Sequence, residues 1–133
     1  MVWSNDREEG KVRCTLTVPE RFNGYPGIVH GGIVATMLDE TSGRAIMLDG
    51  DFDAFMVTMK LEVVYRKPTP TGVPLEVIGW VIRKSSNRAL VAGQVRLPDG
   101  TVTAECTAVV VSPPPEVSEK WENEKVLWKV PQD

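Results

Sequence analysis

A single histidine, a glycine pair and an aspartate are the residues whose types and spacing best suit chemistry in this chain. His30, Gly31 and Gly32 directly precede the apolar run 33–38, and Asp39 follows it. This order predicts a loop that leads into a helix, with glycines where the first amide N–H groups have no intrahelical acceptor. Because a helix start favours negative charge, we expect this segment to stabilise charge that develops on a bound molecule.

Asp39 is unusual because it interrupts an apolar helix face formed by Val34, Met37 and Leu38. An ionised carboxylate on such a face costs free energy unless another group pairs with it or the chemistry uses it. Asp39 is therefore either a member of a structural salt bridge or a catalytic carboxylate, and the latter is the reading we favour.

Composition limits the function classes that this chain can serve. Its 133 residues, 42% of them hydrophobic and 25% charged, are typical of one globular domain. A net charge of -3 without a dense basic block argues against a nucleic-acid partner. The single histidine excludes metal sites that need two, and no Cys-x-x-Cys motif replaces them. We expect neither a metal nor a cofactor.

The termini and the cysteines indicate a cytoplasmic protein. Residues 1–10 are polar and charged where a secretory signal would need an apolar core, and no apolar run is long enough to span a membrane. We therefore expect no membrane partner. Cys14 and Cys106 lie far apart in strand-like segments, which favours two buried thiols in a reducing compartment.

Hydrophobic periodicity predicts one long helix and five strands. The helix runs from about Gly32 to about Leu48, and the alternation of apolar and polar residues predicts strands at 11–18, 55–66, 75–83, 89–97 and 101–111. The helix is apolar around most of its circumference, so a curved sheet should wrap it, which is an α+β architecture. Strict alternation places Thr58 on the outward face with Lys60 and Glu62.

The chain beyond this domain forms a short tail. Residues 116–133 place Val117, Trp121 and Trp128 at helical spacing among charged residues, which predicts a docking helix. Packing on the domain or on a partner subunit is favoured for the tryptophans over ligand contact. We therefore divide the chain into a domain at 1–115 and a docking tail at 116–133.

The His30-Gly31-Gly32 motif with Asp39 in the helix, inside this order of elements, resembles the hotdog-fold acyl-CoA thioesterases. The similarity covers about residues 11–112 and is greatest to the branch related to the phenylacetate pathway. It implies a five- to six-stranded antiparallel sheet wrapped around one long central helix. It also implies hydrolysis of an acyl-CoA thioester, and leaves the acyl group open.

The resemblance assigns roles to the residues of the motif. Asp39 would attack the thioester carbonyl or activate a water molecule, and relatives differ in this choice. Gly31, or its neighbour Gly32, would supply the backbone N–H that stabilises the oxyanion. His30 would orient the loop or bind the carbonyl.

Two further residues, and a second subunit, enter through the same resemblance. Thr58 occupies the position of a Ser or Thr that holds the attacking water, and Asn23 matches a loop asparagine, although it lies one residue farther from His30 than in the relatives. The fold implies a homodimer with shared active sites, where Asp39 and Thr58 of one subunit face His30 and Gly31 of the other. Pairing of two such dimers is expected.

Coenzyme A carries phosphates, so basic and polar residues should line its path. Gly32 should contact the substrate, and the remaining candidates are Arg66, Lys67, Arg83, Lys84, Ser85, Ser86, Asn87 and Arg88. The stretch from Arg83 to Arg88 can equally be a solvated turn.

Two other functions are compatible with such a fold. A non-catalytic acyl-CoA binding or sensor module would hold the ligand without cleaving it, but the relatives that act as sensors carry an added DNA-binding domain, which this chain is too short and too acidic to contain. A hydratase or dehydratase would need a different arrangement of histidine and acid, and the one histidine already belongs to the glycine motif.

Overall fold

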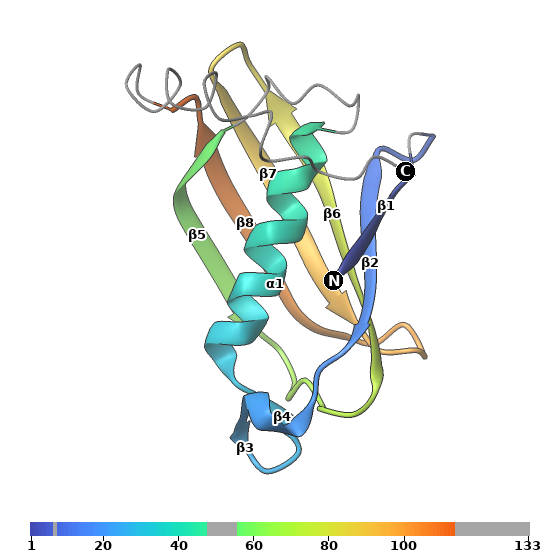
Figure 1. The fold of residues 1–133 in the computed structure, drawn as a ribbon. Helices are drawn as coiled ribbons and strands as arrows, with labels where there is room; N and C mark the ends of the chain where they lie inside the picture. Colours follow the sequence, from blue (N-terminus) through green and yellow to red (C-terminus); the bar gives the residue numbers. More distant parts are fainter. Residues whose placement is uncertain (7, 48–55, 114–133) are drawn as a thin grey trace, which may run out of the picture.

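The computed structural model of the chain describes residues 1–6, 8–47 and 56–113. Six strands form one antiparallel sheet, whose order across the sheet is β1 (Val2–Asp6), β2 (Lys11–Thr17), β6 (Pro74–Lys84), β7 (Arg88–Arg96), β8 (Val102–Val111) and β5 (Val57–Tyr65). Within these described residues one α-helix, α1 (Gly31–Arg44), lies along the concave face of this sheet (Figure 1). The predicted α+β fold, a sheet wrapped around one long helix, is confirmed.

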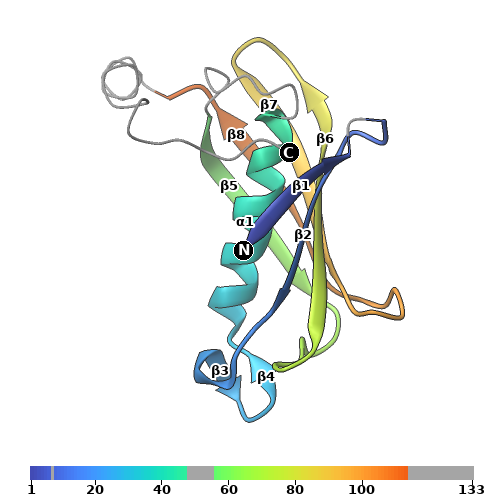
Figure 2. The ribbon, with the colours of Figure 1, turned by 45° about the vertical axis from the view of Figure 1, so that its right-hand side comes forward.

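A short two-stranded hairpin leads into the helix. It consists of β3 (Asn23–Tyr25) and β4 (Ile28–Val29) and follows the 3-10 turn η1 (Glu20–Phe22). Figure 2 shows this hairpin below the start of α1, beyond the end of the large sheet. The chain between β4 and α1 is a single residue, so the hairpin sets the direction in which the helix begins.

The observed elements differ from the sequence prediction at the start of the helix and at the N-terminal strand. The α-helix starts one residue early, at Gly31, and passes into a 3-10 turn, η2 (Ala45–Met47). The predicted helix end at Leu48, the start of the second strand at Phe55 and the tail at 116–133 lie outside the described residues. Strand β1 was not predicted, because its sequence has no alternation of apolar and polar residues.

The core lies between the helix and the concave face of the sheet. Val34, Met37 and Leu38 of α1 are at most 2% exposed. They pack against buried side chains from the four central strands, among them Cys14, Leu75, Val77, Val95, Ala104 and Cys106. No helix within residues 1–6, 8–47 and 56–113 is long and apolar enough to cross a membrane.

A glycine pair lets the helix approach the sheet very closely. Gly79 and Gly93 face each other in the β6–β7 register. A Cβ atom on Gly79 would lie 2.6 Å from the carbonyl oxygen of Thr41 and 2.8 Å from Cα of Ser42, both backbone atoms of α1. Thr41 and Ser42 are completely buried as a result. The small residues on the strands thus decide how deep the second half of α1 sits.

The edge strand β1 closes over the same half of the helix. The indole Nε1 of Trp3 donates a hydrogen bond to Oγ1 of Thr41 at 3.2 Å, and the guanidinium of Arg44 stacks on the Trp3 ring at 3.6 Å from its centroid. Burial lowers the pKa of Arg44, and the nearby carboxylate of Glu40 acts in the opposite direction. Cation–π stacking therefore helps to attach the N-terminal strand to the helix.

Replacement of Gly79 by alanine is expected to destabilise the domain by about 1–3 kcal/mol, the usual cost of overpacking, because the new methyl group meets helix backbone that cannot rotate away. Urea unfolding followed by circular dichroism measures the change. Gly43→Ala is the matched control: nothing in the described structure lies within 4 Å of its Cβ position, so an alanine in this helix should raise stability by about 0.5–1 kcal/mol. Equal effects of the two changes would contradict the close approach at Gly79.

Candidate active site

His30 caps the start of α1 and uses most of the amides there. Its Nδ1 accepts a hydrogen bond from the N–H of Gly32 at 2.9 Å. Its carbonyl oxygen accepts from the N–H groups of Ile33 and Val34 at 2.9 and 3.1 Å. Within the described residues, the N–H of Gly31 is the amide of this first turn that has no acceptor. Gly31, and not Gly32, therefore presents the amide that a ligand can use.

The cap also determines which proton the imidazole can offer. Because Nδ1 accepts from Gly32, the neutral ring carries its proton on Nε2. His30 is exposed and lines the cavity beside the helix start, so its Nε2–H is a donor available to a ligand. The two sequence-based roles of His30, orienting the loop and binding a carbonyl, are thus compatible in one side chain.

Asn23 lies on the hairpin that supports His30. It begins β3 and is paired with Val29 in the register of the hairpin. Its side-chain oxygen is buried and has no hydrogen-bond partner within the described structure. The next residue, Gly24, is so close that a Cβ atom there would lie 3.2 Å from Cα of His30. Asn23 is therefore next to the site, but no hydrogen bond connects it to His30 or Gly31 in the described part of the chain.

Asp39 and Thr58 are in direct contact. The hydroxyl of Thr58 donates a hydrogen bond to Oδ1 of Asp39 at 2.8 Å. Asp39 is half-buried on the side of α1 that faces strand β5. The single hydroxyl proton of Thr58 is used in this bond, and the oxygen keeps lone pairs that can accept from a water molecule.

A β-bulge explains why Thr58 faces the helix, and the prediction that it faces outward is wrong. Thr58 pairs with Val110 and Lys60 with Val109 across the β5–β8 ladder, so Met59 between them has no partner. This extra residue shifts the alternation by one position. Thr58 therefore lies on the same side of the sheet as the buried Val110, whereas Lys60 stays outward. The contact with Asp39 forms inside one chain and needs no dimer interface.

One chain keeps the two halves of the predicted site apart. His30 and Asp39 are separated by two and a half turns of α1, which corresponds to about 13 Å along the axis. A thioester carbonyl that contacts the Gly31 amide therefore cannot contact Asp39 of the same helix. The pair of Asp39 and Thr58 and the pair of His30 and Gly31 form two separate half-sites in the monomer.

The half-site at His30 opens into a cavity of about 690 Å³. Tyr65, at the end of β5, donates a hydrogen bond from its hydroxyl to the carbonyl oxygen of Gly31 at 2.7 Å. Arg66 and Lys67 follow on the rim, but Nε of Arg66 already donates to Oε1 of Glu105 at 2.9 Å. The cavity is also lined by Gly24, Tyr25, Ile28, Val29, Val34, Pro68 and Thr69.

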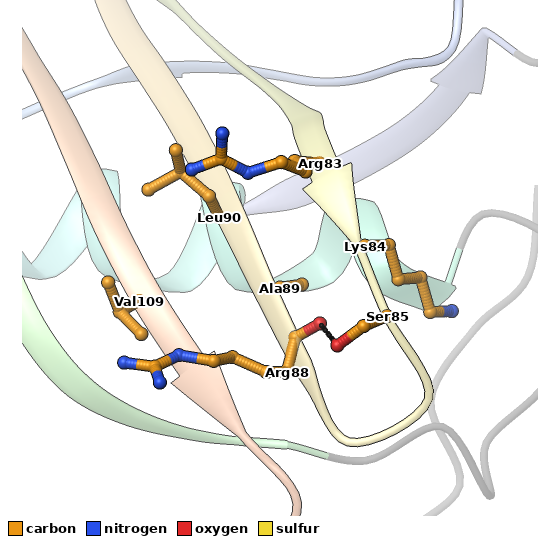
Figure 3. Close-up of a pocket in the computed structure, with 7 residues that line it drawn as sticks. All are labelled: Arg83, Lys84, Ser85, Arg88, Ala89, Leu90 and Val109. Carbon is orange, nitrogen blue, oxygen red and sulfur yellow. Dashed lines mark hydrogen bonds between the residues drawn. The ribbon is translucent and has the colours of Figure 1, made fainter.

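The second basic group predicted to bind substrate lies elsewhere. Arg83, Lys84 and Arg88 line a cavity of about 310 Å³ at the β6–β7 turn. Figure 3 shows this cavity on the face of the sheet away from α1. The guanidinium groups of Arg83 and Arg88 flank Leu90 and Val109, and the side chain of Lys84 points away from both arginines. In Figure 1 the turn is near the C-terminal end of α1, far from the β3–β4 hairpin at the other end of the helix.

The three residues between these cations form a tight turn. The N–H of Ser85 donates to the carbonyl oxygen of Arg88 at 2.8 Å, and the carbonyl oxygen of Asn87 accepts from the N–H of Ser112 at 2.9 Å. Ser85, Ser86 and Asn87 are all exposed. The predicted substrate-binding residues are therefore divided between two regions of the surface, one at each end of the helix.

Both cysteines are buried thiols, as predicted. Burial raises the pKa of Cys106, and the nearby charge of Asp39 acts in the same direction, while hydrogen bonds with Ser42 and Gly93 oppose it. A thiol that is 5% exposed and held in its protonated form is a poor nucleophile. Although Cys106 lies close to Asp39, it is thus a structural residue of the core and not a candidate nucleophile.

Comparison with known proteins gives one family. The family model described as Thioesterase superfamily matches residues 26–104 of the chain. Acyl-coenzyme A thioesterase THEM4 of Xenopus laevis is 29% identical over 108 residues, which are 80% of this chain and 47% of that protein. The chain thus spans about half the length of this curated relative.

Solved structures agree with the observed architecture. A crystal structure described as a thioesterase superfamily protein is 32% identical, with a TM-score of 0.75, and the match covers 83% of this chain and 55% of that one. A Streptococcus mutans protein solved with bound acetyl-CoA has a TM-score of 0.72 at 22% identity, and covers 85% and 86% of the two chains. The second similarity is evidence of shared fold only.

The cap at His30 makes a prediction about stability. His30→Ala removes the side-chain acceptor of the Gly32 amide and should cost about 0.5–2 kcal/mol of unfolding free energy. His30→Asn supplies another good capping acceptor and should stay within a few tenths of a kcal/mol of the parent. Urea unfolding of the three proteins gives both values. Equal destabilisation by the two changes would show that capping is not what His30 contributes.

Proposed function

Because the chain belongs to the thioesterase superfamily, we propose that it hydrolyses acyl-CoA thioesters to a free acid and coenzyme A. The observation that carries this proposal is the half-buried carboxylate of Asp39, which Thr58 orients through a hydrogen bond of 2.8 Å. The amide of Gly31 at the helix start, which has no acceptor among the described residues, supports it, since an anion formed on a thioester carbonyl needs such a donor.

The proposed chemistry divides between the two half-sites. The thioester oxygen accepts from the N–H of Gly31 and from Nε2–H of His30, and each preorganised donor is worth about 3 kcal/mol in the transition state. Asp39 then takes a proton from a water molecule that attacks the carbonyl carbon, which gives the free acid directly. Alternatively, Asp39 attacks this carbon itself, and a water molecule afterwards hydrolyses the acyl-Asp39 anhydride to release the acid and restore the carboxylate. As the tetrahedral intermediate collapses, the C–S bond breaks and coenzyme A leaves as a thiolate that takes up a proton.

This chemistry needs two chains. Since about 13 Å of helix separates His30 from Asp39 in one chain, a homodimer brings His30 and Gly31 of one subunit to Asp39 and Thr58 of the other. Strand β5, which carries Thr58, is an edge of the sheet and pairs only with β8 in the described structure. Its position makes it the natural border between two such subunits. The pairing of two dimers remains part of the proposal.

Two basic regions could bind the phosphates of coenzyme A. Arg83 and Arg88 form no ion pair within the described residues, and they flank an apolar floor that suits a nucleoside. The charge of Arg66, in contrast, is largely neutralised by Glu105. We therefore assign the phosphates mainly to Arg83 and Arg88, because charge that is not already paired contributes more to binding an anion.

The carboxylate is tested by Asp39→Asn. We expect the variant to lose at least about a hundredfold in kcat, the usual contribution of a general base, while it stays folded. Release of coenzyme A is measured with phenylacetyl-, hydroxybenzoyl-, short-chain and medium-chain acyl-CoA. Glu40→Gln is the matched control, because it neutralises the adjacent, exposed carboxylate and should leave kcat unchanged.

Two results would contradict the proposal. If the Asp39→Asn variant kept its activity, the carboxylate would be structural. If the parent protein bound acyl-CoA but released no coenzyme A from any ester of the panel, the chain would instead be an acyl-CoA binding module.

The double variant Arg83→Gln, Arg88→Gln tests the phosphate assignment. We expect KM for acyl-CoA to rise about tenfold, whereas KM for the same acyl group on pantetheine, which has no nucleotide, should not change. Lys60→Gln is a control for loss of positive charge, because Lys60 is an exposed residue that is paired with Glu62. Equal increases of KM for both esters would place the nucleotide elsewhere.

A further inference from the structure

One peptide unit at the start of α1 is held at both ends by side chains. The carbonyl oxygen of Gly31 accepts a hydrogen bond from the hydroxyl of Tyr65 at 2.7 Å. The N–H of Gly32, at the other end of the same peptide unit, donates to Nδ1 of His30 at 2.9 Å. Two side chains from different elements therefore fix the plane of the Gly31–Gly32 peptide.

Glycines need this restraint more than other residues. Without a Cβ atom, Gly31 and Gly32 can adopt a much wider range of φ and ψ than other residues, and the first residue of a helix has no intrahelical bond through its own N–H. The angles φ and ψ of Gly31 relate the Gly31–Gly32 peptide to the preceding peptide, which carries the Gly31 N–H. An amide that is to meet an oxyanion must keep one direction before the substrate binds.

Tyr65 can reach Gly31 because of the same bulge that turns Thr58 toward the helix. Thr58 and Tyr65 are seven residues apart in β5, so strict alternation would put them on opposite faces. The unpaired residue at Met59 brings both onto the helix side. One strand thereby holds Asp39 through Thr58 at 2.8 Å and the start of the helix through Tyr65 at 2.7 Å.

The approach of the ring to the helix is close. A Cβ atom on Gly31 would lie 3.4 Å from the hydroxyl oxygen of Tyr65 and 3.6 Å from Cζ. The phenol ring therefore covers the helix start on the side of β5, while Tyr65 as a whole is 54% exposed and lines the cavity. In this position the hydroxyl contacts the backbone of the predicted oxyanion donor.

We propose that Tyr65 is a positioning residue, which together with His30 clamps the Gly31–Gly32 peptide so that the Gly31 N–H points at the thioester oxygen. This inference rests on the proposed thioesterase activity. Tyr65 transfers no proton in it. Its hydroxyl contributes by removing the freedom of the peptide before the substrate arrives, so it affects the transition state more than the bound substrate.

The test compares Tyr65→Phe with the parent protein and with Trp3→Phe. Tyr65→Phe removes only the hydroxyl, and we expect kcat to fall about tenfold while KM stays within twofold. Trp3→Phe removes a hydrogen bond from another edge strand to the far half of α1. It should therefore lower the free energy of unfolding about as much as Tyr65→Phe does, and leave kcat unchanged. The difference between the two variants separates positioning from general loss of stability.

A second measurement follows the clamp itself. In ¹⁵N-labelled protein without substrate, the amide hydrogen of Gly32 should exchange with solvent faster in Tyr65→Phe than in the parent, and at an unchanged rate in Trp3→Phe.

The possible results distinguish failure of the positioning role of Tyr65 from failure of the proposed thioesterase activity. If the parent is active and Tyr65→Phe keeps its kcat within twofold, the positioning role is overturned and the thioesterase is not. If kcat falls but the Gly32 amide exchanges at the parent rate, the hydroxyl acts in another way and the clamp is overturned. If the parent hydrolyses no acyl-CoA, the proposed function fails, and the positioning role fails with it.

Discussion

The close contact between α1 and the sheet at Gly79 is the constraint on which the rest of the structure depends. A side chain at this position would overlap the helix backbone at Thr41 and Ser42, so the glycine sets the depth of the helix. Depth in turn decides which residues of α1 can touch a strand. Asp39 lies two residues before Thr41 on this helix and accepts a hydrogen bond from Thr58 of β5.

Strand β5 supplies the side chains that contact the candidate site residues of α1. It is an edge strand, and its bulge at Met59 makes two polar side chains face the helix where alternation would allow one. Bulges are common beside active sites, because an extra residue redirects the side chains on one side of it without moving the rest of the sheet. Here the redirected pair, Thr58 and Tyr65, contacts the middle and the start of the same helix.

The charged residues near the candidate site lie at defined positions along α1. The half-buried carboxylate of Asp39 lies near the thiol of Cys106, and its charge helps burial to raise the pKa of this thiol. Positive charge lies near both ends of the helix, at Arg66 and Lys67 and at the turn with Arg83 and Arg88.

The sequence by itself determined the features that depend on neighbouring residues. Glycines before an apolar run predicted the start of α1 to within one residue, and period-two alternation predicted five of the six strands of the large sheet but not the β3–β4 hairpin. The spacing of His30, Gly31 and Asp39 was enough to nominate the candidate site, because helix geometry converts spacing in the chain into position on the helix. The thiols, too, could be called buried from their strand-like surroundings.

Tertiary structure decided whatever depends on a partner element. The face on which Thr58 lies follows from its register with β8, where the bulge reverses the alternation that the sequence predicts. The choice of Gly31 over Gly32 follows from the hydrogen bond that Gly32 donates to the His30 ring. The separation of Arg66 from Arg83 follows from their strands, since Arg66 lines the cavity at the start of the helix and Arg83 lines the cavity at the β6–β7 turn. Strand β1 is held by pairing with β2 and by stacking on Arg44, interactions between residues distant in the chain that local pattern cannot reveal.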